Sequence, residues 1–239
     1  MRQRMKTRDA MVLNDWHLAR MIEHTNLRPE ATEGQIVRLC QEGREFGFVT
    51  VVVNPAYVEL ASSQLAGSEV KVAAVVGFPL GATLASVKRF EAGEVLKLGA
   101  REIDMVLNVG ALKSGKREFV QSEIQSLAEV THERGGLLKV ILETGLLTDD
   151  EKKLACELSV RAGADFVKTS TGFLGGGATV DDVRLMRQIV GPSIGVKASG
   201  GIRTAGDAKA MIAAGANRIG TSSGVKIIEE LREALQTTR

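Results

Sequence analysis

Short apolar runs alternate with segments of helical periodicity along almost the whole of this 239-residue chain, and this alternation limits the possible folds more than any other feature. Eight such runs lie at 21–27, 49–53, 70–77, 102–108, 137–144, 165–170, 194–199 and 218–221. Apolar runs of this length, joined by helix-period segments, are typical of parallel strands linked by helices. The chain lacks the glycine fingerprint of a dinucleotide-binding sheet, and eight units fit a closed barrel better than an open sheet. We therefore expect the α/β fold class, as a single (β/α)8 TIM barrel.

Threonines suited to helix capping precede several of the helix-period segments. Such a threonine accepts a hydrogen bond from a backbone N–H of the first turn, and a Gln or Glu three residues later completes a capping box. The four threonines are Thr32, Thr148, Thr179 and Thr204, of which the first two have capping boxes. The helix that follows run 70–77 is expected to pack on the barrel through a stripe of Val87, Phe90, Val95 and Leu98.

The composition is that of a globular protein, with 44% hydrophobic and 25% charged residues and a net charge of +2. This balance gives no reason to expect a nucleic acid or a membrane as partner, and no segment approaches the length of a membrane span. The basic segment 1–14 is expected to be an N-terminal extension, and 15–239 the barrel domain. Cys40 and Cys156 lie in apolar-periodic segments, which predicts buried thiols in a reducing compartment and therefore a cytoplasmic location.

A metal site is not expected from the arrangement of potential ligands. The three histidines, His17, His24 and His132, are scattered through the chain without the paired spacing of a zinc site. His24 is better explained as a core or rim residue of the first strand. Neither cysteine has a partner at the spacing of a metal or redox motif.

Two lysines stand within apolar strands, Lys168 in DFVKTST and Lys197 in IGVKASGG. An ammonium group is costly to bury, so such a lysine is paired, reaches water, or works as a neutral amine. Asp104 lies in EIDMVLN, where a period of two places it on the same strand face as Glu102. The opposite face is apolar and suits packing against helices, so the polar face lines the barrel. Lys139 belongs to the same lining and is expected to be a structural partner rather than a catalyst.

Two hypotheses explain these buried charges. At its usual pKa a lysine is only about 0.1% neutral near physiological pH, and only the neutral amine attacks a carbonyl. Burial and a neighbouring ammonium both lower the pKa of a lysine. In the first hypothesis Lys168 is the imine-forming nucleophile, Lys197 is the cation that perturbs it, and Asp104 moves protons. In the second, these three residues form a structural ion-pair network with Glu102 and Glu143.

Two glycine-rich turns follow the last two strands: GGIRT at 200–204 and GTSSG at 220–224. Small residues let backbone N–H groups point at an anion, and the start of a helix adds a favourable dipole. We expect a phosphate cradle here, with Arg203 adding positive charge, since barrels often bind phosphate after these strands. Ordinary strand-to-helix turns are the alternative.

An ordered set of motifs resembles the deoxyribose-phosphate aldolases, class I aldolases that cleave 2-deoxyribose 5-phosphate to glyceraldehyde 3-phosphate and acetaldehyde. The motifs are IEHTNLRPEAT, VVNPAYV, VVGFPLGA, GAREIDMVLNVGALKSG, KVILETGLL, GADFVKTSTGF, GVKASGGIRT and GTSSG. The resemblance implies that Lys168 is the Schiff-base lysine, Lys197 the second active-site lysine and Asp104 the proton-shuttling aspartate. It implies no cofactor and leaves a homo-oligomer open. The phosphate- and substrate-binding positions that it implies are Gly172, Gly200, Gly201, Arg203, Gly220, Ser222 and Ser223.

Three positions depart from the family pattern. Val52 stands where many relatives have a cysteine that takes no part in imine chemistry, and Glu23 stands where an aspartate is common. Phe173 replaces a lysine found near the phosphate in some members, so phosphate affinity is expected to depend more on Arg203 and on backbone amides. Two alternatives remain open: another Schiff-base aldolase acting on a different phosphorylated sugar, or a non-catalytic sugar-phosphate-binding barrel.

Overall fold

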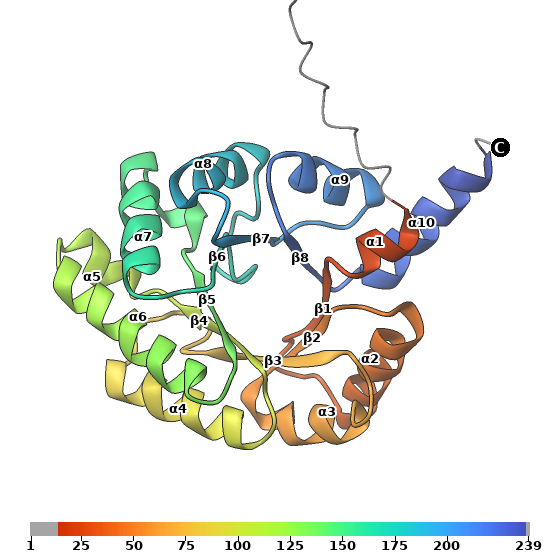
Figure 1. Cartoon of the computed structure of the whole chain (residues 1–239), viewed down its shortest axis with the longest axis horizontal. Coiled ribbons are helices and arrows are strands. Elements are labelled where there is room, and N and C mark those ends of the chain that lie inside the picture. The colour runs from red at the N-terminus through yellow and green to blue at the C-terminus, as the bar shows by residue number, and fades with distance from the viewer. Residues whose placement is uncertain (1–13, 238–239) are drawn as a thin grey trace, which may run out of the picture.

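The computed structural model describes residues 14–237 and contains, within them, a closed barrel of parallel strands in the order β1 to β8 (Figure 1). The strands are β1 (Ile22–Asn26), β2 (Thr50–Val53), β3 (Lys71–Val76), β4 (Glu102–Val106), β5 (Leu137–Ile141), β6 (Phe166–Lys168), β7 (Gly195–Ser199) and β8 (Arg218–Thr221). Helices surround the barrel on its outer side (Figure 1). The predicted α/β fold class, a single (β/α)8 barrel, is confirmed.

Helices α2 to α9 connect consecutive strands, as a parallel barrel requires, while α1 precedes β1 and α10 follows β8. They are α1 (Asp15–Ala19), α2 (Glu33–Phe46), α3 (Val58–Gln64), α4 (Ala85–Lys97), α5 (Val109–Lys113), α6 (Arg117–His132), α7 (Asp149–Arg161), α8 (Val180–Val190), α9 (Ala205–Ala213) and α10 (Gly224–Thr237), with 3-10 turns η1 (Pro55–Tyr57) and η2 (Thr144–Leu146). Apart from Asn14, which caps α1 through its side chain, the predicted extension at 1–14 lies outside the described residues.

The predicted threonine caps begin four of these helices. Thr32 and Thr148 form the expected capping boxes at the starts of α2 and α7, and Thr204 forms a third at the start of α9. The hydroxyl of Thr179 accepts a hydrogen bond from the backbone N–H of Asp182 at the start of α8. These caps satisfy N–H groups that have no partner within the helix, so helix starts were predictable from local sequence.

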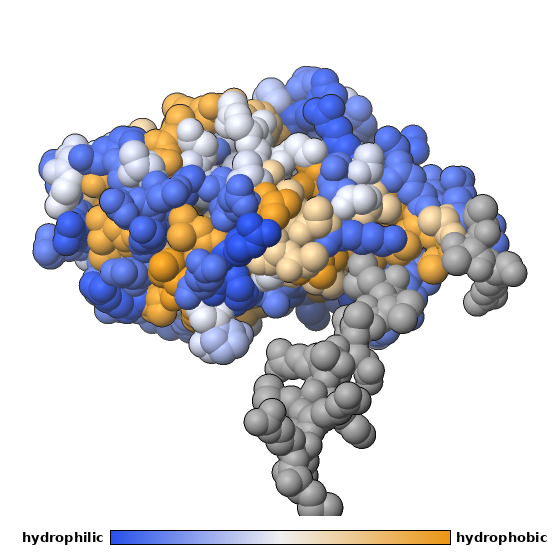
Figure 2. All heavy atoms as spheres, turned by 90° about the horizontal axis from the view of Figure 1, so that it is seen from above, coloured by the Kyte–Doolittle hydropathy of each residue, from blue (hydrophilic) through white to orange (hydrophobic). Residues whose placement is uncertain are grey.

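The barrel strands separate an apolar outer layer from a mixed interior. Outward side chains such as Ile103, Val140 and Val196 are fully buried and pack in the main core against the helices. Inside the barrel, a smaller apolar cluster of Leu27, Val52, Ala73 and Val75, with Phe78 packed against it, covers β2 and β3. Figure 2 shows one side of the helical layer, where hydrophilic residues cover most of the surface and apolar residues gather in smaller areas. Of the helices within residues 14–237, none combines the length and apolar character needed to cross a bilayer.

The orientation of α4 differs from the sequence prediction. Val95 is buried as expected, but Val87, Phe90 and Leu98 are 45%, 69% and 40% exposed, so the predicted packing stripe was wrong for these three residues. The buried face of α4 is formed by Lys88, Ala92, Val95 and Leu96. The physical reason is a buried ion pair on the inner face of the helix, between Lys88 and Glu123 of α6.

Candidate active site

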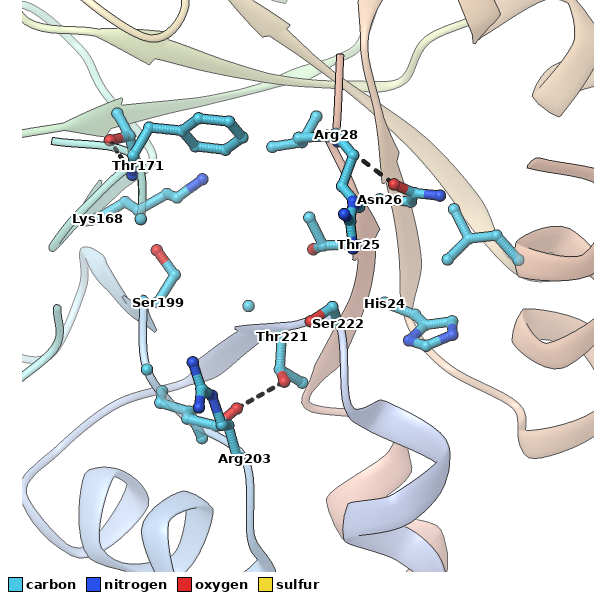
Figure 3. Close-up of a pocket in the computed structure, with 18 of the residues that line it drawn as sticks. His24, Thr25, Asn26, Arg28, Lys168, Thr171, Ser199, Arg203, Thr221 and Ser222 are labelled. Atoms are coloured by element: carbon cyan, nitrogen blue, oxygen red, sulfur yellow. Dashed lines mark hydrogen bonds between the residues drawn. The ribbon is translucent and has the colours of Figure 1, made fainter. Parts of the chain in front are cut away.

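A pocket of about 730 Å³ opens at the carboxyl ends of β1, β6, β7 and β8 (Figure 3). This is the end of a barrel at which chemistry takes place. Its lining includes Thr25, Asn26, Leu27, Arg28, Lys168, Thr171, Gly172, Phe173, Ser199, Gly200, Gly201, Ile202, Arg203, Gly220, Thr221 and Ser222. In Figure 3, Lys168 and Ser199 reach into the pocket from one wall, and Thr25 and Arg28 lie on the opposite wall.

Lys168 is the last residue of β6, and its amine is buried at the base of this pocket. The amine donates a hydrogen bond to Oδ2 of Asp104 on β4, at 2.7 Å. Lys197 on β7 donates to the same oxygen, also at 2.7 Å. The register explains this convergence, because Lys168 and Lys197 are direct neighbours across the β6–β7 pair. The sequence prediction that these three residues meet inside the barrel is confirmed.

The ion pairs extend beyond these three residues into a connected buried network. Lys139 contacts Asp104 at 2.9 Å, Glu102 at 2.5 Å and Glu23 at 3.4 Å. Lys197 also donates to Glu23. Arg218 lies 3.6 Å from Glu23 and 3.7 Å from Glu102. The predicted partnership of Lys139 is therefore confirmed.

The balance of charges explains why one lysine of the network releases its proton more readily than usual. These ion pairs join four cationic side chains (Lys139, Lys168, Lys197 and Arg218) to three carboxylates (Glu23, Glu102 and Asp104), within residues 14–237. A net buried charge is costly, and a lysine can neutralise it by releasing a proton. Lys168 is the lysine of the network with a single carboxylate partner and the one that lines the pocket.

The pKa of Lys168 reflects these surroundings. Burial, assisted by the nearby charge of Lys197 and opposed by Asp104, lowers the pKa of Lys168 to about 8. At that value about a fifth of the amine is neutral near pH 7.4, against about 0.1% at the ordinary pKa. Burial acts to raise the pKa of Asp104, but Lys139, Lys168 and Lys197 outweigh it and hold that pKa well below its ordinary value. Asp104 is therefore a carboxylate that stabilises charge on the lysines around it.

Most of the predicted phosphate positions meet on one side of the pocket. The six that line it are Gly172 after β6, Gly200, Gly201 and Arg203 after β7, Gly220 within β8, and Ser222 directly after β8. Ser223 does not line the pocket; its backbone N–H donates to the hydroxyl of Thr221, and its carbonyl accepts from Ile227 of α10. Gly172, Gly200 and Gly201 have φ of 83°, 95° and 80°, which suits glycine because larger residues rarely adopt such angles.

Glu143 does not belong to the ion-pair network in which the structural hypothesis placed it. β5 ends at Ile141. Glu143 lies beyond the strand, has a positive φ of 58°, and so does not follow the alternation of side chains along β5. Its carboxylate accepts the backbone N–H of Thr171 at 3.1 Å, so it holds the turn that follows Lys168. Sequence alternation could not show this, because the apolar stretch continues through Leu142, beyond the end of the strand at Ile141.

Other residues of the site were not singled out from the sequence. Arg218 stands at the start of β8, two residues before Gly220, and a period of two would have placed both on the inner face. Thr25 lies on the opposite wall of the pocket, and Phe78 meets the pocket residue Phe173 edge to face at a ring-centroid distance of 5.1 Å. Phe173 thus presents an apolar ring to the pocket, as its sequence position suggested.

The histidines and cysteines lie outside the lysine network, although His24 and its partner Glu42 also line the pocket. His24 packs against Phe48, and its Nε2 lies 2.8 Å from Glu42, while His132 lies 2.9 Å from Asp165. Burial raises the pKa of the Cys156 thiol to about 12 and that of the Cys40 thiol to about 11. Such thiols are poor nucleophiles.

A partly neutral amine at the base of a barrel pocket defines a class of protein, the barrels equipped for imine chemistry on a small carbonyl compound. Residues 15–230 match the DeoC/LacD family of aldolases, and the chain belongs to this family. A deoxyribose-phosphate aldolase of Thermococcus gammatolerans is 58% identical over 219 residues, which cover 91% of this chain and 97% of the relative. One of Streptococcus gordonii is 58% identical over 212 residues, covering 89% and 96%.

Solved structures agree with the sequence relatives. The tetrameric deoxyribose phosphate aldolase from Aeropyrum pernix superposes with a TM-score of 0.87 at 39% identity. The match covers 92% of this chain and 93% of that one. The aldolase QR15 gives a TM-score of 0.88 at 43% identity, covering 93% and 99%. The barrel and its family are thus established by both kinds of comparison.

Proposed function

We propose that this protein is a class I aldolase that reversibly cleaves 2-deoxy-D-ribose 5-phosphate to D-glyceraldehyde 3-phosphate and acetaldehyde through a Schiff base on Lys168. The observation that carries the proposal is the buried amine of Lys168, with its pKa lowered to about 8, at the base of a pocket with a glycine-rich, arginine-bearing side. The relatives at 58% identity support the choice of substrate.

The first step forms the imine. The neutral amine of Lys168 attacks carbon 1 of the open-chain sugar, and the carbinolamine loses water to give a protonated imine. Asp104, alone or through a water molecule, moves the protons that this step requires, and Lys197 supplies a positive charge beside it. Because Asp104 contacts both lysines through one oxygen, a proton can pass between the amines over a short distance.

The second step breaks the bond between carbons 2 and 3. The hydroxyl on carbon 3 gives up its proton, the bonding electrons move to carbon 2, and the imine nitrogen accepts the charge as an enamine forms. D-glyceraldehyde 3-phosphate then leaves. Protonation of the enamine at carbon 2 and addition of water release acetaldehyde and the free amine of Lys168. The reaction needs a proton donor, a proton acceptor and an electron sink. The imine on Lys168 is the electron sink, and Asp104 with Lys197 beside it serves the proton transfers.

The phosphate of the substrate is proposed to occupy the side of the pocket formed by Gly172, Gly200, Gly201 and Ser222, with Arg203 at its edge. The starts of α9 and α10 follow these turns and add favourable dipoles. Ser223 contributes through its place at the start of α10 rather than through direct lining. Phe173 offers no charge at this side, so binding there depends on Arg203 and backbone N–H groups.

Assembly and location complete the proposal. The small-molecule partners are the phosphorylated sugar and acetaldehyde, and we propose that copies of the chain associate with one another in the cytoplasm. The structurally similar aldolase of Aeropyrum pernix is a tetramer. In this chain, Leu84 directly before α4 and Phe90 within α4 are each 69% exposed, and they form an apolar area suited to contact with another copy. Buried free thiols suit a reducing compartment.

Trapping of the imine tests the proposed function. Incubation of the protein with acetaldehyde and borohydride should leave a two-carbon adduct on Lys168, located by peptide mass spectrometry. The Lys168→Met variant should give no adduct at this site and should lose at least about 10⁴-fold in cleavage of 2-deoxyribose 5-phosphate. Absence of any lysine adduct would indicate a non-catalytic binding barrel. An adduct on Lys168 without turnover of this sugar would indicate an aldolase for another phosphorylated sugar.

A further inference from the structure

The two active-site lysines are almost equivalent with respect to Asp104. Both donate to the same oxygen, Oδ2, at the same distance of 2.7 Å, and both are buried. Asp104 would therefore stabilise an ammonium group on Lys168 and one on Lys197 to a similar degree. The proposed chemistry requires the first to be neutral and the second to be charged. Another group must therefore distinguish them.

Glu23 is the group that distinguishes them. Its carboxylate accepts a hydrogen bond from Lys197, while no such contact joins it to Lys168 among the ion pairs of the described chain. Glu23 comes from β1 and is fully buried, so water does not screen its charge. Lys197 is therefore in direct ion pairs with two carboxylates and Lys168 with one, and Glu23 raises the pKa of Lys168 less than Asp104 does.

Other charged groups surround Glu23 and determine its protonation. Lys139 from β5 lies 3.4 Å from Oε2, and Arg218 from β8 lies 3.6 Å from Oε1. The charge of Asp104 on β4 acts to raise the pKa of Glu23. Burial also raises that pKa, but Lys139 and Lys197 together lower it below its ordinary value, so Glu23 remains ionised.

From this geometry we infer that Glu23 is a positioning residue that assigns the proton to Lys197 and thereby makes Lys168 the nucleophile. The inference rests on the proposed aldolase function, because it concerns the same two amines. Glu23 does not touch the pocket, so its effect reaches the reaction through Lys197. Without the carboxylate, the network would hold four cationic groups against two carboxylates, and Lys197 would keep Asp104 as its one remaining ion-pair partner within the described residues.

The pH dependence of kcat/KM for cleavage of 2-deoxyribose 5-phosphate tests this inference. The inference predicts an alkaline limb whose position depends on the carboxylate of Glu23. In Glu23→Gln, whose side chain has nearly the same shape, this limb should move to lower pH by at least about one unit, a tenfold loss of activity at the alkaline end. Glu23→Asp keeps the carboxylate and should retain the limb of the parent protein within about 0.3 units, even if its rate is lower.

Glu102→Gln is the matched control. It removes one carboxylate from the same buried network, but Glu102 contacts Lys139 and Arg218 rather than Lys168 or Lys197. Its alkaline limb should therefore move by less than about 0.3 units. Circular dichroism and thermal unfolding would first establish that each variant is folded. If Glu23→Gln is not folded, Glu23→Met, which also removes the carboxylate, takes its place in the comparison.

Two results would overturn the inference. One is an unchanged alkaline limb in folded Glu23→Gln, and the other is an equal shift in Glu23→Gln and Glu102→Gln, which would make the total charge responsible. Either result leaves the proposed function in place as long as the parent protein forms its borohydride-trapped adduct on Lys168. Failure of the proposed function would instead show as absence of that adduct.

Discussion

Lys168 and Lys197 are the same type of residue on neighbouring strands, yet their contacts give them different tasks. Lys168 lines the pocket and has one carboxylate partner, whereas Lys197 lies beneath it and has two. Lowering the pKa of Lys168 from 10.5 to about 8 corresponds to about 3 kcal/mol of preference for the neutral amine. Burial supplies the largest part of this preference, and the charge of Lys197 adds to it.

Removal of that second charge provides a prediction at the residue scale. In Lys197→Met the pKa of Lys168 should rise, because Asp104 then acts on Lys168 without the opposing ammonium. A lysine with a raised pKa becomes neutral only at higher pH, so the acid limb of the kcat/KM profile should move upward from about 8. Activity near pH 7 should fall by at least about tenfold. An acid limb that stays in place or moves downward would contradict the role given to Lys197.

Residue-scale chemistry was largely predictable from the sequence, because strand alternation places side chains reliably on one face or the other. Lys168, Lys197 and Asp104 were found in this way. The selective contact of Glu23 with Lys197 was not, since it joins residues 174 positions apart and exists only once the barrel has closed between β8 and β1. Glu143 was misplaced because the end of β5 cannot be predicted from apolar character alone.

At the scale of elements, α4 is held to the barrel by a buried ion pair rather than by large apolar side chains. The amine of Lys88 donates to Glu123 of α6 and to the carbonyl of Val106 at the end of β4, both at 2.9 Å. Both side chains of the pair are fully buried. Periodicity within α4 could not reveal this pair, because its partner lies 35 residues away on another helix.

Breaking this pair should destabilise the protein more than replacing it. Lys88→Met leaves Glu123 buried without its cation, which typically costs about 3–5 kcal/mol of unfolding free energy. The double variant Lys88→Met with Glu123→Leu should recover most of that loss, because no uncompensated charge remains. Urea unfolding of the two variants and the parent protein measures the difference. Equal stability of the single variant and the parent would mean that the pair does not hold α4.

β8 provides a second prediction at this scale, because Gly220 on this strand leaves room for the side chain of Lys197. A Cβ at Gly220 would lie 2.8 Å from Cβ of Ser199 and 2.9 Å from Cε of Lys197. Gly220→Ala should therefore displace Lys197 and reduce kcat by about 10–100-fold while the barrel still folds. Gly206→Ala in α9 is the control, since the added methyl would meet no atom closer than 3.7 Å. Full activity of Gly220→Ala would show that the close approach to Lys197 has no role.

At the scale of the whole molecule, closure of the barrel brings charges from β1, β4, β5, β6, β7 and β8 into one enclosed network. The opposite side of the interior, along β2 and β3, is apolar. The barrel, its family motifs and the end that carries the pocket were predictable, because each can be recognised from residues that are close together in the sequence. The outward face of α4 was not, since an apolar stripe in sequence does not say which side it faces.

That outward face gives a prediction for assembly. If Leu84, Val87 and Phe90 contact another copy of the chain, then Phe90→Ser should lower the mean mass measured by sedimentation velocity. The separated chains should remain folded. Val160→Ser, on the outer side of α7, should leave the mass unchanged. An unaltered mass for Phe90→Ser would remove α4 from the proposed contact.

The protonation of Lys168 is the property on which the proposed chemistry depends most directly. It can be followed by NMR titration of protein labelled with ¹³C at lysine Cε, with the Lys168 signal assigned by its absence from Lys168→Arg. We predict a titration midpoint near 8. A midpoint at or above the ordinary lysine value of about 10.4 would mean that the amine stays charged at physiological pH, and would contradict the role of Lys168 as nucleophile.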